Sequence, residues 1–167
     1  MSVYVLDSNF FIQAHRAYYP MDVAIGFWVK VRQLAEQGKI ISIDKVKKEL
    51  YDKNDVLEDW CRNNLPADFF KDTSALVQTS YPQVIAWAIS RQEHYTLGAL
   101  NEFLDADEAD AFLVAYGHAD AADRCIVTQE VSEPNRKTKI KIPEACTALN
   151  VQYVNTIAMF RKLSETF

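Results

Sequence analysis

The sequence predicts an α/β fold around a mainly parallel sheet, because short apolar segments alternate with helical patterns along its 167 residues. The first such segment, Val3–Leu6, is apolar at every position, which is typical of a strand that helices cover on both faces. From residue 22 to 36 the apolar side chains fall on one helical stripe, and Gly38 suits the end of that helix. A second apolar segment, Ile40–Ile43, then completes the strand–helix–strand order of a parallel unit.

The same alternation continues to the end of the chain. The predicted elements are helices at 45–52, 55–65, 73–95 and 107–119, a strand at 125–128, a helix at 144–149, a strand at 151–154 and a helix at 156–163. Asp44 suits the N-cap of the first of these helices, and Pro82 is a point where the third could break. Segments 96–105 and 129–142 are predicted loops. We expect one domain, 1–167, whose helices between 44 and 119 form one long crossover on one side of the sheet, with a helical insertion at about 53–105.

Composition narrows the class of protein. The chain is 49% hydrophobic and 12% aromatic, enough apolar surface for an ordinary core. No apolar run approaches the ~20 residues of a membrane span, and the N-terminus lacks the basic region of a secretory signal. Cys61, Cys125 and Cys146 are too widely spaced for a metal motif, so we expect reduced, half-buried thiols in a cytoplasmic protein.

Four acidic residues stand where an open α/β sheet binds its ligands. Asp7 ends the first strand, Glu49 lies in the helix after the second, Asp110 lies early in the helix before the third, and Glu130 follows the third. Ligands of such sheets bind at the carboxyl ends of strands where the strand order reverses. If the first and third strands are neighbours, Asp7 and Glu130 flank that point.

Carboxylate oxygens of this kind suit Mg²⁺ or Mn²⁺, which also bind phosphate oxygens. Such a site could hydrolyse a phosphodiester, one metal supplying the hydroxide and a second, if present, steadying the leaving oxygen. The net charge of −5 disfavours nucleic-acid binding by bulk electrostatics, but a bound cation would screen the acidic site.

Each acid alone has a simpler interpretation. Asp7 could be a turn former or a helix cap, and Glu49 a solvated helix residue. Asp110 competes with Asp105, Asp107 and Glu108, since a run of acids at a helix N-terminus is favoured by the macrodipole in any case. The argument for a site therefore depends on the set.

The set resembles the PIN-domain family. The matching segments are VYVLDSNFFI with Asp7, ISIDKVKKEL with Glu49, ADAFLVAYGHA with Asp110, and IVTQE with Glu130, in the family's order over nearly the whole chain. The segment from Lys139 to Leu163 is similar to that of an uncharacterised PIN-like subfamily. One departure is Glu130, which stands where the family usually has Asp.

This resemblance implies a three-layer α/β/α sandwich, with a short, mainly parallel sheet of four or five strands and helices on both faces. It implies an endoribonuclease with Mg²⁺ or Mn²⁺ as cofactor, in which the four acids hold the metal directly or through water. Ser8, Asn9 and Thr128 match supporting positions, and Asp107 could share or replace the role of Asp110. Many relatives are toxins of toxin–antitoxin pairs, so the expected partners are RNA, a small antitoxin protein and a second copy in a homodimer.

The most basic stretch lies beside this predicted site. Arg136, Lys137, Lys139 and Lys141 could contact RNA phosphates, although alternating Lys and Ile also describes an edge strand protected by charge.

Two other functions compete with the nuclease. A PIN-fold protein-interaction module with weak or no activity would use its helices on a partner, and the Glu130 departure leaves that interpretation open. A phosphotransfer enzyme ranks lower, because a haloacid-dehalogenase-type phosphatase needs a second Asp where Asn9 stands, and no glycine-rich phosphate loop appears.

Overall fold

A five-stranded sheet forms the centre of the protein, in a computed structural model that describes residues 2–167. Its strands are β1 (Val3–Leu6), β2 (Ile40–Ile43), β3 (Phe70–Lys71), β4 (Arg124–Val127) and β5 (Gln152–Val154). They lie in the order β3-β2-β1-β4-β5, and every neighbouring pair is parallel. The predicted parallel α/β sheet is therefore confirmed, with β3 as a short strand that the sequence pattern did not indicate.

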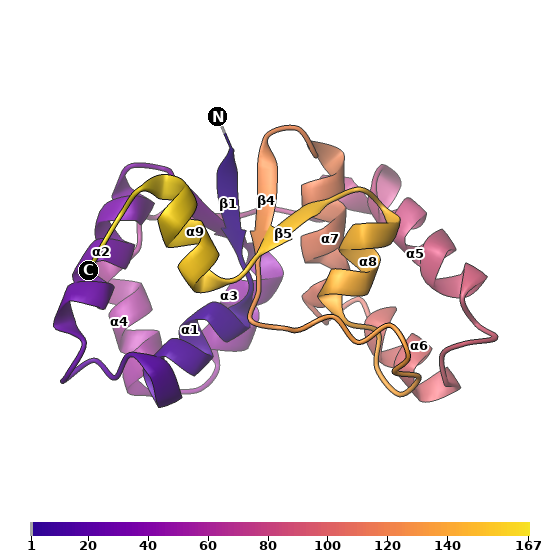
Figure 1. Ribbon diagram of the computed structural model, residues 1–167, viewed down its shortest axis with the longest axis horizontal. Coiled ribbons are helices and arrows are strands. Elements are labelled where there is room, and N and C mark those ends of the chain that lie inside the picture. Colours follow the sequence, from indigo (N-terminus) through magenta and orange to yellow (C-terminus); the bar gives the residue numbers. More distant parts are fainter. Residues whose placement is uncertain (1) are drawn as a thin grey trace.

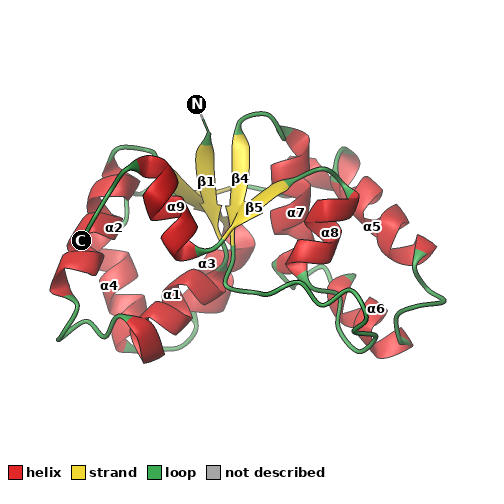
Figure 2. Cartoon of the chain, viewed as in Figure 1, coloured by secondary structure: helices red, strands yellow, loops and turns green. Residues whose placement is uncertain are grey.

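Helices cover both faces of this sheet (Figures 1 and 2). One layer holds α1 (Ser8–Gln13), the π-helical turn η1 (Ala14–Tyr18), α2 (Ile25–Glu36), α3 (Asp44–Tyr51), α4 (Val56–Asn64) and α9 (Thr156–Leu163). The other holds the 3₁₀ turn η2 (Ser74–Gln78), α5 (Tyr81–Ser90), α6 (Leu97–Phe103), α7 (Asp110–Ala119) and α8 (Ile142–Ala148). The central strands are buried between these layers, as their uninterrupted apolar sequence predicts.

The expectation that all helices between 44 and 119 lie on one side of the sheet is wrong. The chain moves outward from β2 to β3 through α3 and α4, then returns across the sheet to β4 through α5, α6 and α7. Because crossovers between parallel strands are right-handed, reversing direction places the returning helices on the opposite face. The reversal falls between β1, the central strand of the sheet, and its neighbour β4.

The predicted loop at 96–105 is also wrong, because most of it forms α6. The Thr96 side chain accepts a hydrogen bond from the Ala99 backbone N–H at 3.2 Å and so caps the helix N-terminus. Phe103 is buried in the core and anchors the other end.

The predicted helix at 73–95 is divided into η2 and α5. Residues 79 and 80 separate the two, and Pro82 lies in the first turn of α5, where a missing backbone N–H costs no helical hydrogen bond. Asp44 is the first residue of α3 and does not cap it; its carboxylate instead accepts hydrogen bonds from Thr73 Oγ1 at 2.7 Å and Thr73 N at 3.2 Å. This contact ties the end of β2 to the chain after β3.

The three cysteines are free thiols, and all are buried rather than half-buried. Burial raises the pKa of Cys61 to about 12 and that of Cys125 to about 11, so neither is a reactive thiolate near neutral pH. Within residues 2–167, no helix combines the length and the apolarity needed to cross a bilayer.

Gly117 provides a test of the packing of α7 on the sheet. A Cβ at this position would lie 2.7 Å from Val151 Cγ1 and 3.1 Å from Ile126 Cδ1, so Gly117→Ala should lower the free energy of unfolding by about 1–3 kcal/mol. In Gly98→Ala, the nearest atom is 4.0 Å away, so that variant should be neutral or up to about 1 kcal/mol more stable. Denaturant unfolding of both variants makes the comparison; equal stabilities would contradict the packing.

Candidate active site

The carboxyl ends of β1 and β4 meet at the point where the strand order reverses. Asp7 follows β1 directly and Thr128 follows β4 directly, and the residues before them, Leu6 and Val127, are paired in the sheet. The Asp7 backbone N–H donates to the Val127 carbonyl at 2.9 Å, and the buried Ser42 hydroxyl on β2 donates to the Leu6 carbonyl at 2.5 Å. The backbone before and at Asp7 is thus fixed by both neighbouring strands, at the ligand-binding position of an open α/β sheet.

The Asp7 carboxylate is held by two hydroxyls rather than by its own helix. Its side chain is 1% exposed and makes no capping hydrogen bond to α1. Thr128 Oγ1 donates to one carboxylate oxygen at 2.9 Å, and Ser8 Oγ donates to the other at 3.3 Å. The structure therefore places Ser8 and Thr128 in contact with Asp7, and the helix-cap interpretation of Asp7 does not account for its side chain.

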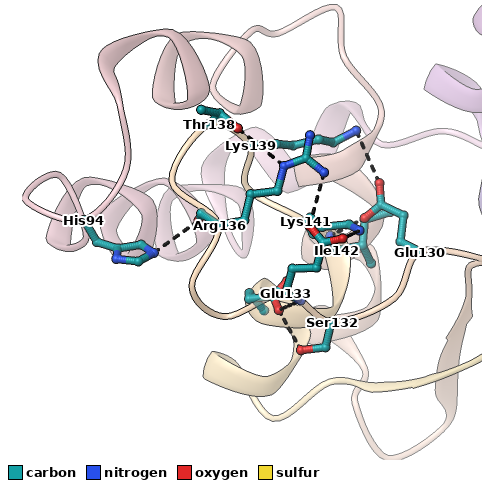
Figure 3. A network of polar contacts seen from close by, with 10 residues as sticks. His94, Glu130, Ser132, Glu133, Arg136, Thr138, Lys139, Lys141 and Ile142 are labelled. Carbon is teal, nitrogen blue, oxygen red and sulfur yellow. Dashed lines mark hydrogen bonds and ion pairs between the residues drawn. The ribbon is translucent and has the colours of Figure 1, made fainter.

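Glu130 is fixed in place by the segment that follows it (Figure 3). One carboxylate oxygen accepts the backbone N–H of Ile142 at 2.7 Å, and the other lies 3.5 Å from the Lys139 ammonium. Its own backbone N–H donates to Thr128 Oγ1 at 3.1 Å. Glu130 is therefore connected to Asp7 through one hydroxyl, while both of its carboxylate oxygens have protein partners.

One pocket of about 340 Å³ gathers the predicted acids. Its lining residues are Asp7, Ser8, Asn9, Ile12, Glu49, Lys53, Glu102, Glu108, Asp110, Glu130 and Lys139. The four carboxylates proposed from the sequence thus share one pocket, although they come from the end of β1, from α3, from α7 and from the segment after β4. Asn9 also lines this pocket.

Two further acids in this wall, Glu102 and Glu108, were not among the predicted site residues. Glu102 belongs to α6, where the sequence predicts a loop and therefore no helix face for it; Glu108 lies in an acidic run whose members the sequence alone does not distinguish. Asp107, in contrast, lies outside the pocket lining: it is exposed and forms an ion pair with Lys48 at 3.3 Å. The reason is that α7 begins at Asp110, and the preceding turn directs Asp107 away.

Negative charge in this pocket is poorly compensated. Burial raises the pKa of Asp7 to about 6; the Thr128 hydrogen bond opposes this shift, and the nearby Glu130 and Glu49 carboxylates add to it. The pKa of Asp110 is raised well above its usual range by burial and then by the charges of Asp7 and Glu130. A cation bound in the pocket would therefore offset the repulsion between these carboxylates.

Most of the basic stretch is already paired with acids (Figure 3). Arg136 lies 3.2 Å and Lys141 3.4 Å from the Glu133 carboxylate, while Lys139 pairs with Glu130. Lys137 is exposed, and none of the ion pairs found among residues 2–167 includes it. The stretch forms no strand, so it is not a charged sheet edge; its contact with RNA stays a prediction.

Comparison with solved structures supports the fold class. A chain of the crystal structure of VapBC2 from Rickettsia felis bound to a DNA fragment from their promoter is similar, with a TM-score of 0.54 at 16% sequence identity. The match covers 92% of this chain and 98% of that one. Together with the sheet order, it confirms the PIN-like three-layer α/β/α fold.

The chain belongs to a protein family described as a domain of unknown function (DUF4411), whose model matches residues 4–167. That description assigns no activity to its members. No curated protein matches the chain.

The buried Asp7 charge predicts a pH-dependent gain of stability in Asp7→Asn. The folded-state pKa of about 6 exceeds the ordinary aspartate value of 3.8, so the folded protein favours the protonated carboxyl; the stability that this preference contributes is present below pH 3.8 and is lost as the pH rises through 6. Asp7→Asn should therefore match the wild type near pH 4 and exceed its free energy of unfolding by about 1–3 kcal/mol at pH 8 in EDTA. Urea unfolding at both pH values measures this; a variant that is less stable at pH 8 would contradict it.

Proposed function

We propose that this protein is a metal-dependent endoribonuclease whose active site is the pocket of Asp7, Glu49, Asp110 and Glu130. The observation that carries the proposal is the convergence of these carboxylates from four separate elements on the strand-order reversal of a PIN-like fold. Keeping a buried, like-charged cluster together costs stability, as the raised pKa values of Asp7 and Asp110 indicate. A fold that maintains such a cluster is best explained by a cationic ligand.

The donor chemistry suits Mg²⁺ or Mn²⁺, although the acids do not form a closed cage. Among residues 2–167, no three Asp, Glu, His or Cys side chains come close enough to constitute a preformed metal-ligand group. A Mg²⁺ ion usually keeps several of its waters and takes only one or two carboxylates directly. A pocket of about 340 Å³ with spaced carboxylates fits such a hydrated ion, because oxygens that do not touch the ion can bind its waters.

We assign a role to each of these acids from the contacts that its carboxylate makes. Asp7 keeps one well-oriented carboxylate at the floor of the pocket, because Thr128 and Ser8 fix its position. Glu49 and Asp110 approach from α3 and α7, and we assign them with Asp7 as the primary ligands. Glu130, whose carboxylate is already paired with the Lys139 ammonium and accepts the Ile142 N–H, is assigned as a positioning acid that acts through Thr128. A divalent cation bound there would supply Lewis-acid activation of water and of a phosphodiester oxygen.

RNA as the substrate follows from the resemblance to PIN-domain nucleases, and the electrostatics are compatible with it. The chain carries a net charge of −5, and most of its basic loop is paired, so long-range attraction of phosphates is weak. Substrate affinity in this proposal depends on the cation bound in the pocket, which converts an acidic surface into one that accepts phosphate.

The central test is cleavage of structured RNA by the pure protein with Mg²⁺ or Mn²⁺. Asp7→Asn and Asp110→Asn should each lower the rate by at least about 100-fold, since each removes a charge that holds the ion. Asp107→Asn is the matched control and should keep wild-type activity, because Asp107 lies outside the pocket. Cleavage that survives EDTA, or that Asp7→Asn retains, would contradict the assignment.

We also propose that a small partner protein restrains this activity, as the antitoxin of a toxin–antitoxin pair. The supporting observations are the fold it shares with a VapBC2 chain and an apolar groove of about 450 Å³ between α2 and α4. Trp28 and Trp60 form its floor, and Ile25 and Val29 stay exposed beside them. Such a groove suits the apolar face of a partner helix.

Co-expression with the product of any small reading frame that adjoins the gene tests this restraint. We expect a stable complex with reduced ribonuclease activity, which Val29→Glu should disrupt because it replaces an apolar contact of the groove with a charged side chain. Val77→Glu, at an exposed apolar position on η2, is the control and should leave the complex intact. A complex that survives Val29→Glu would contradict this docking site.

A further inference from the structure

Of the two lysines that line the acidic pocket, Lys139 is the one that forms an ion pair with a pocket acid. It lies at the wall of the pocket, 3.5 Å from the Glu130 carboxylate, and its side chain is 33% exposed. It also lines a small adjoining cavity together with Asp110, Glu102 and Glu108. Lys53 lines the main pocket too, but forms no ion pair with any residue of the described chain.

Core packing and hydrogen bonds fix the backbone on both sides of Lys139, and this restricts the position of its ammonium group. Ile140 and Ile142 are buried in the core, and the Ile142 N–H donates to Glu130. Before them, the Lys137 carbonyl accepts the Thr96 N–H at 2.9 Å. Figure 3 shows the Lys139 side chain extending from this anchored segment to Glu130.

The negative charge of the pocket in turn shifts the pKa of Lys139. Burial alone lowers the pKa of this lysine, but the carboxylates of Glu130, Asp110 and Glu102 outweigh burial and raise the pKa above its usual value. The ammonium therefore stays charged and interacts with several of the acids that a divalent cation would need.

We propose that the Lys139 ammonium is an internal counter-ion of the acidic pocket, which competes with a divalent cation for its carboxylates. This inference rests on the proposed function only in taking the pocket as a cation site. Its consequence is that Lys139 stabilises the metal-free protein and sets the metal concentration at which the pocket fills. Lys139 is thus a positioning residue for Glu130 and a determinant of metal affinity.

The test is a Mn²⁺ titration of the full chain at pH 8, followed by thermal unfolding. Lys139→Met should melt lower than the wild type in EDTA and bind Mn²⁺ roughly two- to tenfold more tightly, because the competing charge is gone. Lys139→Arg keeps the charge and should bind Mn²⁺ like the wild type. Lys137→Met, in the same segment and exposed, is the matched control and should change neither quantity.

A second neutral variant, Lys139→Gln, should repeat the Lys139→Met result if the side chain's bulk is unimportant. Unchanged or weaker Mn²⁺ binding in both neutral variants would overturn the proposal and leave Lys139 as a structural ion pair. Where RNA cleavage is observed, the Mn²⁺ concentration giving half-maximal rate should fall by the same factor. Failure of the wild type to cleave RNA would count against the ribonuclease alone, because the thermal titration measures metal binding without it.

Discussion

The carboxylate of Asp7, buried at the junction of β1 and β4, is the constraint around which the candidate site is arranged. A charge in that position requires partners, and the fold provides them from the strand beside it: Thr128 donates to Asp7 and accepts from the Glu130 backbone. The same hydroxyl therefore orients two acids. Because the neighbouring strands fix the backbone through hydrogen bonds, Asp7 cannot swing out to solvent, and the rest of the pocket is built around its position.

The electrostatics of the pocket explain why this arrangement of carboxylates suits a cation. Burial and mutual repulsion raise the pKa values of Asp7 and Asp110, so the metal-free protein holds its carboxylates together at a cost. Lys139 offsets part of the charge from one side of the pocket. A divalent cation would offset more, since it carries two charges and binds several oxygens at once. Stability and proposed activity are thus linked through the same few groups.

Several residues that line this candidate pocket are predictable from the sequence because their signals are local. An apolar run that stops at Asp7 predicts both the buried strand and an acid at its carboxyl end, and the run before Thr128 predicts the strand after which Glu130 follows. Glu102 was missed because the helix that presents it depends on a Thr96 cap and on Phe103 packing in the core. Asp107 is an alternative to Asp110 in the sequence because periodicity predicts that a helix is present but not which residue begins it.

Crystals grown without metal and then soaked in Mn²⁺ provide the most direct test of the central claim. Anomalous difference density, which identifies manganese by its own scattering, should show a peak in the pocket between Asp7, Glu49 and Asp110, and the peak should be absent from soaked crystals of Asp7→Asn. A pocket that stays empty of manganese in the wild-type crystals, or a peak that persists in the variant, would contradict the account.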